Sequence, residues 1–318
     1  MKPHYYSAHA SALRAELAHA LPRDVTRDLH RNAPWRHGVV AARQFLILGL
    51  ATWGLVRVAS PLIWIPLAVV QGLTVFNFTV LLHEVVHHAV FGARRARLER
   101  WLGYLYAIPS GISASQFTRW HLDHHDELGS SESDPKRHHL SPKVNARWLK
   151  LLYCTPALFP IYFRAAGRET ATYPEALRRA ISRERLVAMA AHLAVLASLW
   201  WFAGGVAALR AYVVPVFFVF PVAFTLNRLG QHYSIDPGDP AGWSTLMRGH
   251  WFWDAAFLNS NYHLEHHYFP GVPFYRLPAL QRALTPYYAK KGLRWQTYGS
   301  LVWGWFVENK APHTKWAD

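Results

Sequence analysis

Residues 44–82 read QFLILGLATWGLVRVASPLIWIPLAVVQGLTVFNFTVLL, and residues 83–88 continue directly as HEVVHH. The first of these stretches contains one charged residue, Arg57. A helix needs about 20 apolar residues to cross a bilayer, so this stretch is long enough to cross and return. Ser60 and Pro61 supply turn residues near its middle. The stretch therefore predicts a pair of membrane-spanning helices that delivers a histidine cluster at its end.

A second stretch of the same kind covers residues 186–227, where Arg210 is the one charge and Gly204-Gly205 lies near the middle. Helices of soluble proteins usually carry a polar face, which neither stretch has. This favours a membrane protein over four buried helices of a soluble one. We expect an all-α membrane protein with four transmembrane helices in two hairpins.

The composition agrees with a membrane location. Of the 318 residues, 52% are hydrophobic and 17% are charged, whereas soluble domains carry about 25% charged residues. Cys154 is the one cysteine, which excludes a disulfide framework and a thiolate metal site. The formal net charge of +15 is more natural for segments beside anionic lipid than for a nucleic-acid surface.

The distribution of basic residues predicts the orientation in the membrane. Of 34 Lys and Arg residues, 7 lie in residues 1–43, 16 in 83–185 and 9 in 228–318. Positive charge accumulates on the cytoplasmic side, so both termini and the long middle segment are expected there, in a bacterial inner membrane. The chain divides into a cytosolic segment 1–43, a membrane and metal-binding domain 44–285 and a cytosolic tail 286–318.

The middle segment holds two shorter apolar pieces, near residues 101–117 and 148–163, each interrupted by proline. Their length and aromatic content predict helices that lie at the membrane interface without spanning it. Four arginines follow the first histidine cluster, between Arg94 and Arg100. They suit a lipid-facing basic surface, or contact with a phosphate or an acidic acyl carrier.

Histidines form three clusters, which read HEVVHH at residues 83–88, HLDHH at 121–125 and HLEHH at 263–267. On a helix, positions i, i+3 and i+4 share one face, so at least two imidazoles of each cluster can converge. One such pair on an apolar helix is weak evidence for a metal site. Three clusters at the same membrane face, where both hairpins return the chain, are strong evidence.

The number of imidazoles favours two metal ions. The clusters supply eight at ligand spacing, and His232, just after the fourth predicted helix, makes nine. A zinc ion is satisfied by three or four ligands, and imidazole-rich sites with open positions suit iron. The predicted ligands are His83, His87, His121, His124, His125, His232, His263, His266 and His267. The acids between the clustered histidines are candidates to orient the rings, namely Glu84, Asp123 and Glu265.

Two other histidines are weaker candidates. His88 follows His87 directly and so points about 100° away from it on a helix. His192 stands alone in an apolar stretch, where a packed or interfacial side chain is the expected role. The remaining histidines have no partner at ligand spacing and are predicted to lie on the surface.

The segments HEVVHH, RWHLDHH and NYHLEHHYFP, in this order around two hairpins, resemble the membrane fatty acid desaturase superfamily over roughly residues 45–285. The resemblance implies a mushroom-like fold, with four transmembrane helices beneath a cytosolic helical cap that holds a di-iron site. When the three histidine clusters are matched to those of the superfamily, the resemblance implies the same nine histidines as ligands of two Fe ions, with O₂ as co-substrate. Asn227 precedes His232 by five positions, so no ligand role is carried over to it.

This resemblance implies an oxygen-dependent fatty-acyl desaturase acting on a lipid chain. The alternatives within the superfamily are a fatty acid hydroxylase, a terminal-alkene-forming decarboxylase and a carotenoid ketolase or hydroxylase. The sequence has no HPGG motif of a fused cytochrome b5 and no clustered cysteines. A separate electron donor, of ferredoxin or cytochrome b5 type with its reductase, is therefore expected.

A further alternative is a zinc-stabilised scaffold or a metal transporter. Transporters bind their ions near the bilayer midplane, whereas these clusters fall beyond the apolar stretches, which disfavours that class.

Overall fold

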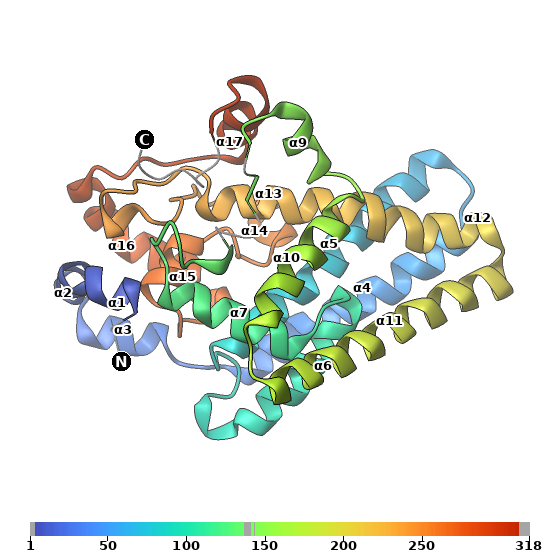
Figure 1. Cartoon of the computed structure of the whole chain (residues 1–318), viewed down its shortest axis with the longest axis horizontal. Helices are drawn as coiled ribbons and strands as arrows, with labels where there is room; N and C mark the ends of the chain where they lie inside the picture. Colours follow the sequence, from blue (N-terminus) through green and yellow to red (C-terminus); the bar gives the residue numbers. More distant parts are fainter. Residues whose placement is uncertain (1–3, 137–140, 143, 312–318) are drawn as a thin grey trace.

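The computed structural model describes residues 4–136, 141–142 and 144–311, and this part of the chain is helical without a named strand. Four helical segments are long and apolar enough to cross a membrane, namely Arg23–Arg57, Pro61–Val86, Glu175–Ala203 and Gly205–His232. Figure 1 shows the long helices running side by side, with the shorter helices of both chain ends gathered at one end of them. The all-α class and the four apolar helices agree with the sequence prediction.

The first two long helices are α4 (Pro34–Arg57) and α5 (Pro61–Val86), which pack along each other. Each begins with proline, whose fixed φ suits the first helical position. Residues 58–60 connect them, at the predicted turn. Because α5 ends at Val86, His83 lies in its last turn and His87 directly follows it.

The third and fourth long helices are separated by Gly204, which adopts φ +85° between α11 (Glu175–Ala203) and α12 (Gly205–Ala208). The fourth continues through the π-helical segment η2 (Leu209–Val219) into α13 (Phe220–His232). Pro215 lies inside η2, and its missing N–H favours local widening of a helix. The sequence prediction did not include this irregularity.

Close contacts hold the long helices together. Gln71 of α5 donates a 2.5 Å hydrogen bond to the carbonyl of Ala211. A Cβ atom on Gly72 would lie 2.7 Å from the carbonyl oxygen of Pro215, so α5 approaches η2 as closely as only glycine allows. Arg210 donates to the carbonyl of Val58, which joins the ends of the two helix pairs.

The shorter helices lie before, between and after the long ones. They are α1 (Tyr5–His9), α2 (Ser11–Ala20), α3 (Arg23–Leu29), α6 (Ala96–Ser110), α7 (Ala114–Asp126), α9 (Arg147–Leu152), α10 (Leu158–Ala171), α14 (Trp251–Ala256), α15 (His263–Tyr268), α16 (Leu277–Lys291) and α17 (Tyr298–Val302). Short 3-10 or π segments are η1 (Ala93–Arg95), η3 (Pro240–Gly242), η4 (Phe274–Arg276) and η5 (Trp303–Val307). Helix α6 packs on both α5 and α11.

The two apolar pieces of the middle segment form α6 with the start of α7, and α9 with the start of α10. None of these helices is among the four that are long and apolar enough to span, in agreement with the prediction. Pro109 lies in the last turn of α6. The arginines from Arg94 to Arg100 are exposed around the start of that helix.

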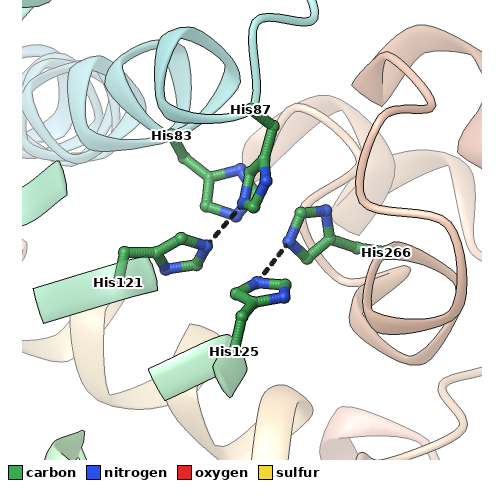
Figure 2. Close-up of side chains that lie close together, drawn as sticks. All are labelled: His83, His87, His121, His125 and His266. Atoms are coloured by element: carbon green, nitrogen blue, oxygen red, sulfur yellow. Dashed lines mark hydrogen bonds between the residues drawn. The ribbon is translucent and has the colours of Figure 1, made fainter. Parts of the chain in front are cut away.

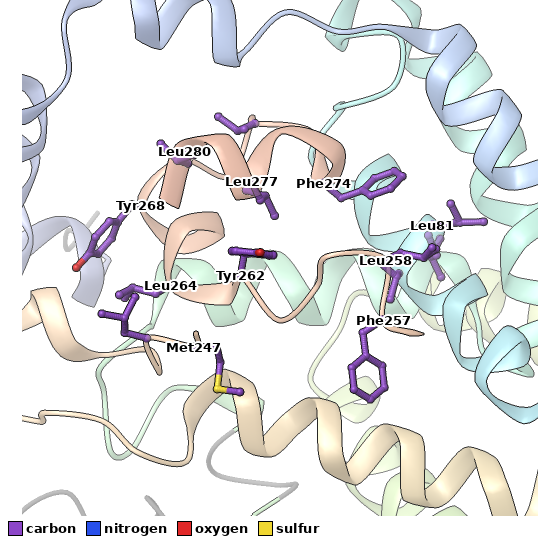
Figure 3. Packing of buried hydrophobic residues seen from close by; sticks show 14 of the residues in the cluster. Leu81, Met247, Phe257, Leu258, Tyr262, Leu264, Tyr268, Phe274, Leu277 and Leu280 are labelled. Atoms are coloured by element: carbon purple, nitrogen blue, oxygen red, sulfur yellow. The ribbon is translucent and has the colours of Figure 1, made fainter. Parts of the chain in front are cut away.

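One hydrophobic core joins the end of α5 to the short helices. Figure 3 shows Leu81 of α5 near Leu258 and Phe257, with Leu264 and Leu277 farther along the same core. All five are at most 3% exposed, and burying such a side chain contributes about 1.5–3 kcal/mol. Buried leucines of α2 belong to the same core. The histidine-bearing segments are thus fixed to one another by apolar packing.

Candidate metal centre

Five of the nine predicted histidines form a first group, which we call centre A. Its members are His83, His87, His121, His125 and His266, and one nitrogen of each lies within 4.8 Å of the others. The Nε2 atoms of His87 and His121 are 2.8 Å apart, and those of His125 and His266 are 3.0 Å apart. Figure 2 shows these rings converging from the end of α5 and from α7 and α15.

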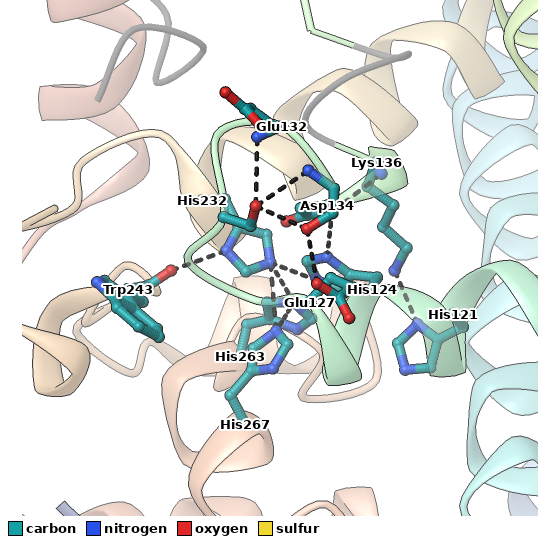
Figure 4. A network of polar contacts seen from close by, with 12 residues as sticks. His121, His124, Glu127, Glu132, Asp134, Lys136, His232, Trp243, His263 and His267 are labelled. Carbon is teal, nitrogen blue, oxygen red and sulfur yellow. Dashed lines mark hydrogen bonds and ion pairs between the residues drawn. The ribbon is translucent and has the colours of Figure 1, made fainter. Parts of the chain in front are cut away.

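The other four predicted histidines form centre B, which consists of His124, His232, His263 and His267, again within 4.8 Å of one another. The Nε2 atom of His232 lies 3.1 Å from that of His124, 3.0 Å from that of His263 and 3.2 Å from that of His267. His232 is the last residue of α13. Figure 4 shows its ring turned towards the other histidines of the centre.

Helices α7 and α15 each serve both centres. On α7, His121 and His125 are four residues apart and belong to centre A, whereas His124 belongs to centre B. On α15, His263 and His267 belong to centre B and His266 to centre A. Positions i and i+4 share a helix face, and the i+3 ring lies to its side. The HxxHH spacing therefore lets one helix reach two neighbouring sites.

The nitrogen spacing fits bound metal ions. Two imidazole nitrogens held at about 2.0–2.1 Å from one ion, at right angles, lie about 3 Å apart. The Nε2 atom of His232 has three nitrogen neighbours at 3.0–3.2 Å, and one ring nitrogen cannot form three hydrogen bonds to other ring nitrogens. The Nε2 atom of His83 is buried without a hydrogen-bond partner. Both observations are compatible with a cation at each centre.

Burial keeps these rings neutral, which leaves a lone pair for a metal. It lowers the pKa well below the ordinary value for the seven rings outside the membrane-spanning helices, since desolvation disfavours the charged form. These rings are His87, His121, His124, His125, His263, His266 and His267.

In several rings the Nδ1 atom, which points away from the centre, is held by a polar partner (Figure 4). Nδ1 of His124 is 2.8 Å from Oδ1 of Asp134, and Nδ1 of His232 donates to the carbonyl of Trp243 at 3.1 Å. A 2.7 Å hydrogen bond joins Nδ1 of His121 to the Lys136 side chain. Such partners fix which ring nitrogen faces the metal and how the ring is turned.

The acids that lie between the clustered histidines play a smaller part than the sequence predicted. Asp123 pairs with Arg119 at 2.9 Å, and Glu265 accepts hydrogen bonds from Gln281 and Tyr288. Glu84 accepts from the backbone of Phe274, with its other oxygen 3.6 Å from Nδ1 of His83. Over the described residues, the carboxylate bonded to a ring of either centre is that of Asp134. On a helix, the residue beside a ligand points away from it, which explains the difference.

The two weaker candidates remain outside both centres. His88 is exposed, with φ +53° directly after the end of α5. His192 is held by the hydroxyl of Tyr212 at 2.7 Å and the carbonyl of Ile108 at 2.8 Å. It is a packed histidine, as predicted.

A cavity of about 600 Å³ adjoins centre A, within the range of ligand pockets. Its wall includes His83 and Val75 of α5, which are eight residues and hence about 12 Å apart along the helix. Side chains from α10, α11 and η2, including Phe159, Leu196 and Val216, line the remainder. The cavity is therefore long and mainly apolar, and four histidines of the two centres form part of its wall, namely His83, His121, His263 and His266.

Comparison with known proteins identifies the family to which this chain belongs. The family model for fatty acid desaturases matches residues 59–299. The chain belongs to the fatty acid desaturase family. It is 29% identical over 254 residues to the human sphingolipid delta(4)-desaturase/C4-monooxygenase, covering 75% of this chain and 71% of the relative.

The human sphingolipid delta(4)-desaturase is 27% identical over 226 residues, covering 67% of this chain and 62% of the relative. The sphingolipid delta(4)-desaturase of Xenopus tropicalis is 25% identical over 226 residues, which again cover 67% of this chain and 62% of the relative. With four apolar helices, this desaturase family member is an integral membrane oxidoreductase whose histidine clusters suit metal binding.

Three residues near the desaturase centre were missed by sequence reasoning. Asp134 and Lys136 follow the turns after α7, where no periodic pattern predicts which side chain points inward. Arg228 lines the cavity, and its position in the sequence could have identified it as a candidate functional residue. It is a charged residue one helical turn before His232, in a helix that is otherwise nearly free of charge.

Proposed function

We propose that this protein is an oxygen-dependent desaturase that introduces a double bond into a lipid acyl chain through two irons held by the nine histidines of centres A and B. The observation that carries the proposal is the convergence of all nine predicted ligands into two adjacent groups beside an apolar cavity. Imidazole-rich sites with open positions suit iron that reacts with oxygen.

Bound iron, with O₂ and two electrons, supplies the oxidising power to remove hydrogen from an unactivated methylene. The reaction balances when the chain loses two hydrogens, O₂ accepts these together with two electrons and two protons, and two waters form. The protein's own contribution is positioning. The apolar side chains of the cavity wall, Val75 and Phe217 among them, hold the lipid chain and exclude water. The buried hydrogen-bond partners of the imidazole rings keep the metal ligands in place.

Hydroxylation is the second candidate, favoured by one observation. The human relative at 29% identity is named as both a desaturase and a C4-monooxygenase. The two reactions share the first hydrogen removal and differ in whether a second hydrogen is lost or oxygen is returned. Sphingolipids are the substrates in the relatives' names, which supports a long-chain lipid as the substrate here.

The arrangement in the membrane follows from charge and connectivity. We infer two hairpins, α4 with α5 and α11 with α12–α13, beneath a cap of shorter helices on the cytoplasmic side, because Lys and Arg concentrate in the segments outside the long helices. Residues 44–285 form the membrane and metal-binding domain, between cytosolic segments 1–43 and 286–318. Reporter fusions at residues 146 and 206 should report opposite sides.

Electrons reach the centre from a separate ferredoxin or cytochrome b5 with its reductase. Product analysis tests the reaction itself. Lipids from bacterial cells with and without the gene are compared by mass spectrometry, and the proposal predicts species two mass units lighter that carry a new double bond. Species sixteen units heavier would favour the hydroxylase, and unchanged lipids from cells that contain the iron-loaded protein would contradict both.

A further inference from the structure

A positive charge lies in the wall of the apolar cavity. Arg228 of α13 lines this cavity, as His263 and His266 do, and lies within the fourth apolar helical segment. It is partly accessible, although its neighbours Asn227 and Leu229 are buried. An ionisable residue inside a membrane-spanning segment is costly, and it marks a functional site by default.

Several other polar side chains of this wall have hydrogen-bond partners. Gln231 donates to Asn227 at 2.8 Å, and Asn227 donates to Ser260 at 2.7 Å. Arg185, a second arginine of the wall, donates to Gln116 at 2.8 Å. Lys136 is bonded to His121.

Arg228 differs from these side chains. Over the part of the chain that the structure describes, no hydrogen bond or ion pair to its guanidinium is found. Asp134 is the carboxylate that acts on it electrostatically, and that carboxylate is already bonded to His124 and to the backbone of Lys136. A guanidinium has five N–H donors and pairs most strongly with oxyanions.

The positive charge of metal ions bound at the two centres would favour an anion in the cavity near Arg228. All nine imidazoles are neutral ligands, so they do not offset the charge of bound metal ions. Arg228 lies one helical turn from His232, at a spacing that brings Cβ atoms to about 5–6 Å. A cation so close to a cationic centre is stabilised by a negative group in the cavity.

We propose that Arg228 binds the oxyanion head group of the substrate, so that the lipid enters with a carboxylate or phosphate against α13 and its chain along the apolar wall. This proposal rests on the proposed function and narrows its substrate to an acidic acyl lipid. Because Arg228 is one turn from His232 of centre B and lines the same cavity as His263 and His266, the reacting carbons lie near the polar end of the chain.

Binding measurements on the iron-loaded protein test this proposal. In detergent and without oxygen, calorimetry gives dissociation constants for hexadecanoate, hexadecyl phosphate and hexadecanol, which share one chain and differ in the head group. The wild type should bind at least one of the two acids more tightly than the alcohol. A charge-assisted hydrogen bond predicts about a 10- to 100-fold preference. Tighter binding of hexadecanoate would identify a carboxylate head group, and tighter binding of hexadecyl phosphate would identify a phosphate.

Two variants and a control make the result specific. Arg228→Gln should abolish the preference for the acid over the alcohol, and Arg228→Lys should keep part of it because the charge remains. Arg282→Gln, which removes an exposed arginine of α16, should match the wild type. Iron content is measured for each variant, and Arg228→Lys provides the comparison if Arg228→Gln loses its metal.

Two results would overturn the proposal. One is a wild type that binds acid and alcohol equally, and the other is an Arg228→Gln protein that keeps the wild-type preference. Product analysis on the same samples separates this proposal from the proposed function. An acid preference lost in Arg228→Gln, with no oxidised product from the wild type under reducing conditions with O₂, supports the anion site and contradicts the desaturase.

Discussion

The Nε2 atoms of His124 and His232 lie 3.1 Å apart, although 108 residues separate them in the chain. His124 comes from the second histidine cluster on α7, and His232 ends the fourth apolar helix. Their contact couples the position of a long helix to the geometry of centre B. It also gives a role to a histidine that belongs to none of the three clusters.

His232→Ala should abolish product formation and lower the iron content, because His232 is the member of centre B that faces all three others. Membrane insertion should be unaffected, since the change comes at the end of the helix. Iron per chain and product yield are measured together. His19→Ala, an exposed histidine of α2, is the control. Full iron with near-normal turnover in His232→Ala would show that the clusters alone hold the metals.

Asp134→Asn should weaken iron binding, because the amide is a poorer acceptor than the carboxylate for Nδ1 of His124, which lies 2.8 Å away. Loss of such an outer partner typically costs about 10- to 100-fold in metal affinity or activity. Iron retained against increasing chelator is the measurement. Asp28→Asn, at an exposed pair with Arg276, serves as the control. Equal retention by the wild type and Asp134→Asn would remove Asp134 from the centre.

Gly72→Ala should destabilise the protein, because the added Cβ would lie 2.7 Å from the carbonyl oxygen of Pro215 and force α5 away from η2. Overpacking of this kind costs about 1–3 kcal/mol. Gly49→Ala in α4 meets no atom within 4 Å, so the better helix propensity of alanine should leave it equally or more stable. Thermal unfolding in detergent compares the two, and equal midpoints would contradict the close contact.

Val216→Trp should shorten the longest chain that is oxidised, because Val216 of η2 lines the cavity and a larger side chain fills the space for the lipid. Product profiles from acyl chains of graded length measure the effect. Val222→Trp is the matched control, since Val222 is 38% exposed and does not line the cavity. An unchanged length limit in Val216→Trp would place the chain elsewhere.

Much of the fold could be predicted because its signals are local. The apolar stretches around Ser60 and Gly204 predicted four long helices, and the structure breaks the helices at those residues. The spacing within the clusters similarly predicted that at least two imidazoles of each cluster would converge. The convergence of all nine into two groups was expected from clusters that meet at one membrane face.

The remaining features depend on contacts between distant segments. The carbonyl of Trp243 that holds His232 is a backbone group, which no residue type reveals. Asp134 is one of several acids after α7 and has no periodic position. The π-helical segment around Pro215 packs against Gly72 of α5, which is far from it in the sequence. These partners are selected by tertiary packing and leave no pattern in the sequence around them.

Metal content tests the central claim most directly. Protein purified from iron-replete cells is analysed for iron and zinc per chain by mass spectrometry of the elements. Nine neutral imidazoles in two groups predict about two irons per chain and little zinc, because imidazole sites with open positions suit iron. One zinc per chain with no iron would contradict the account.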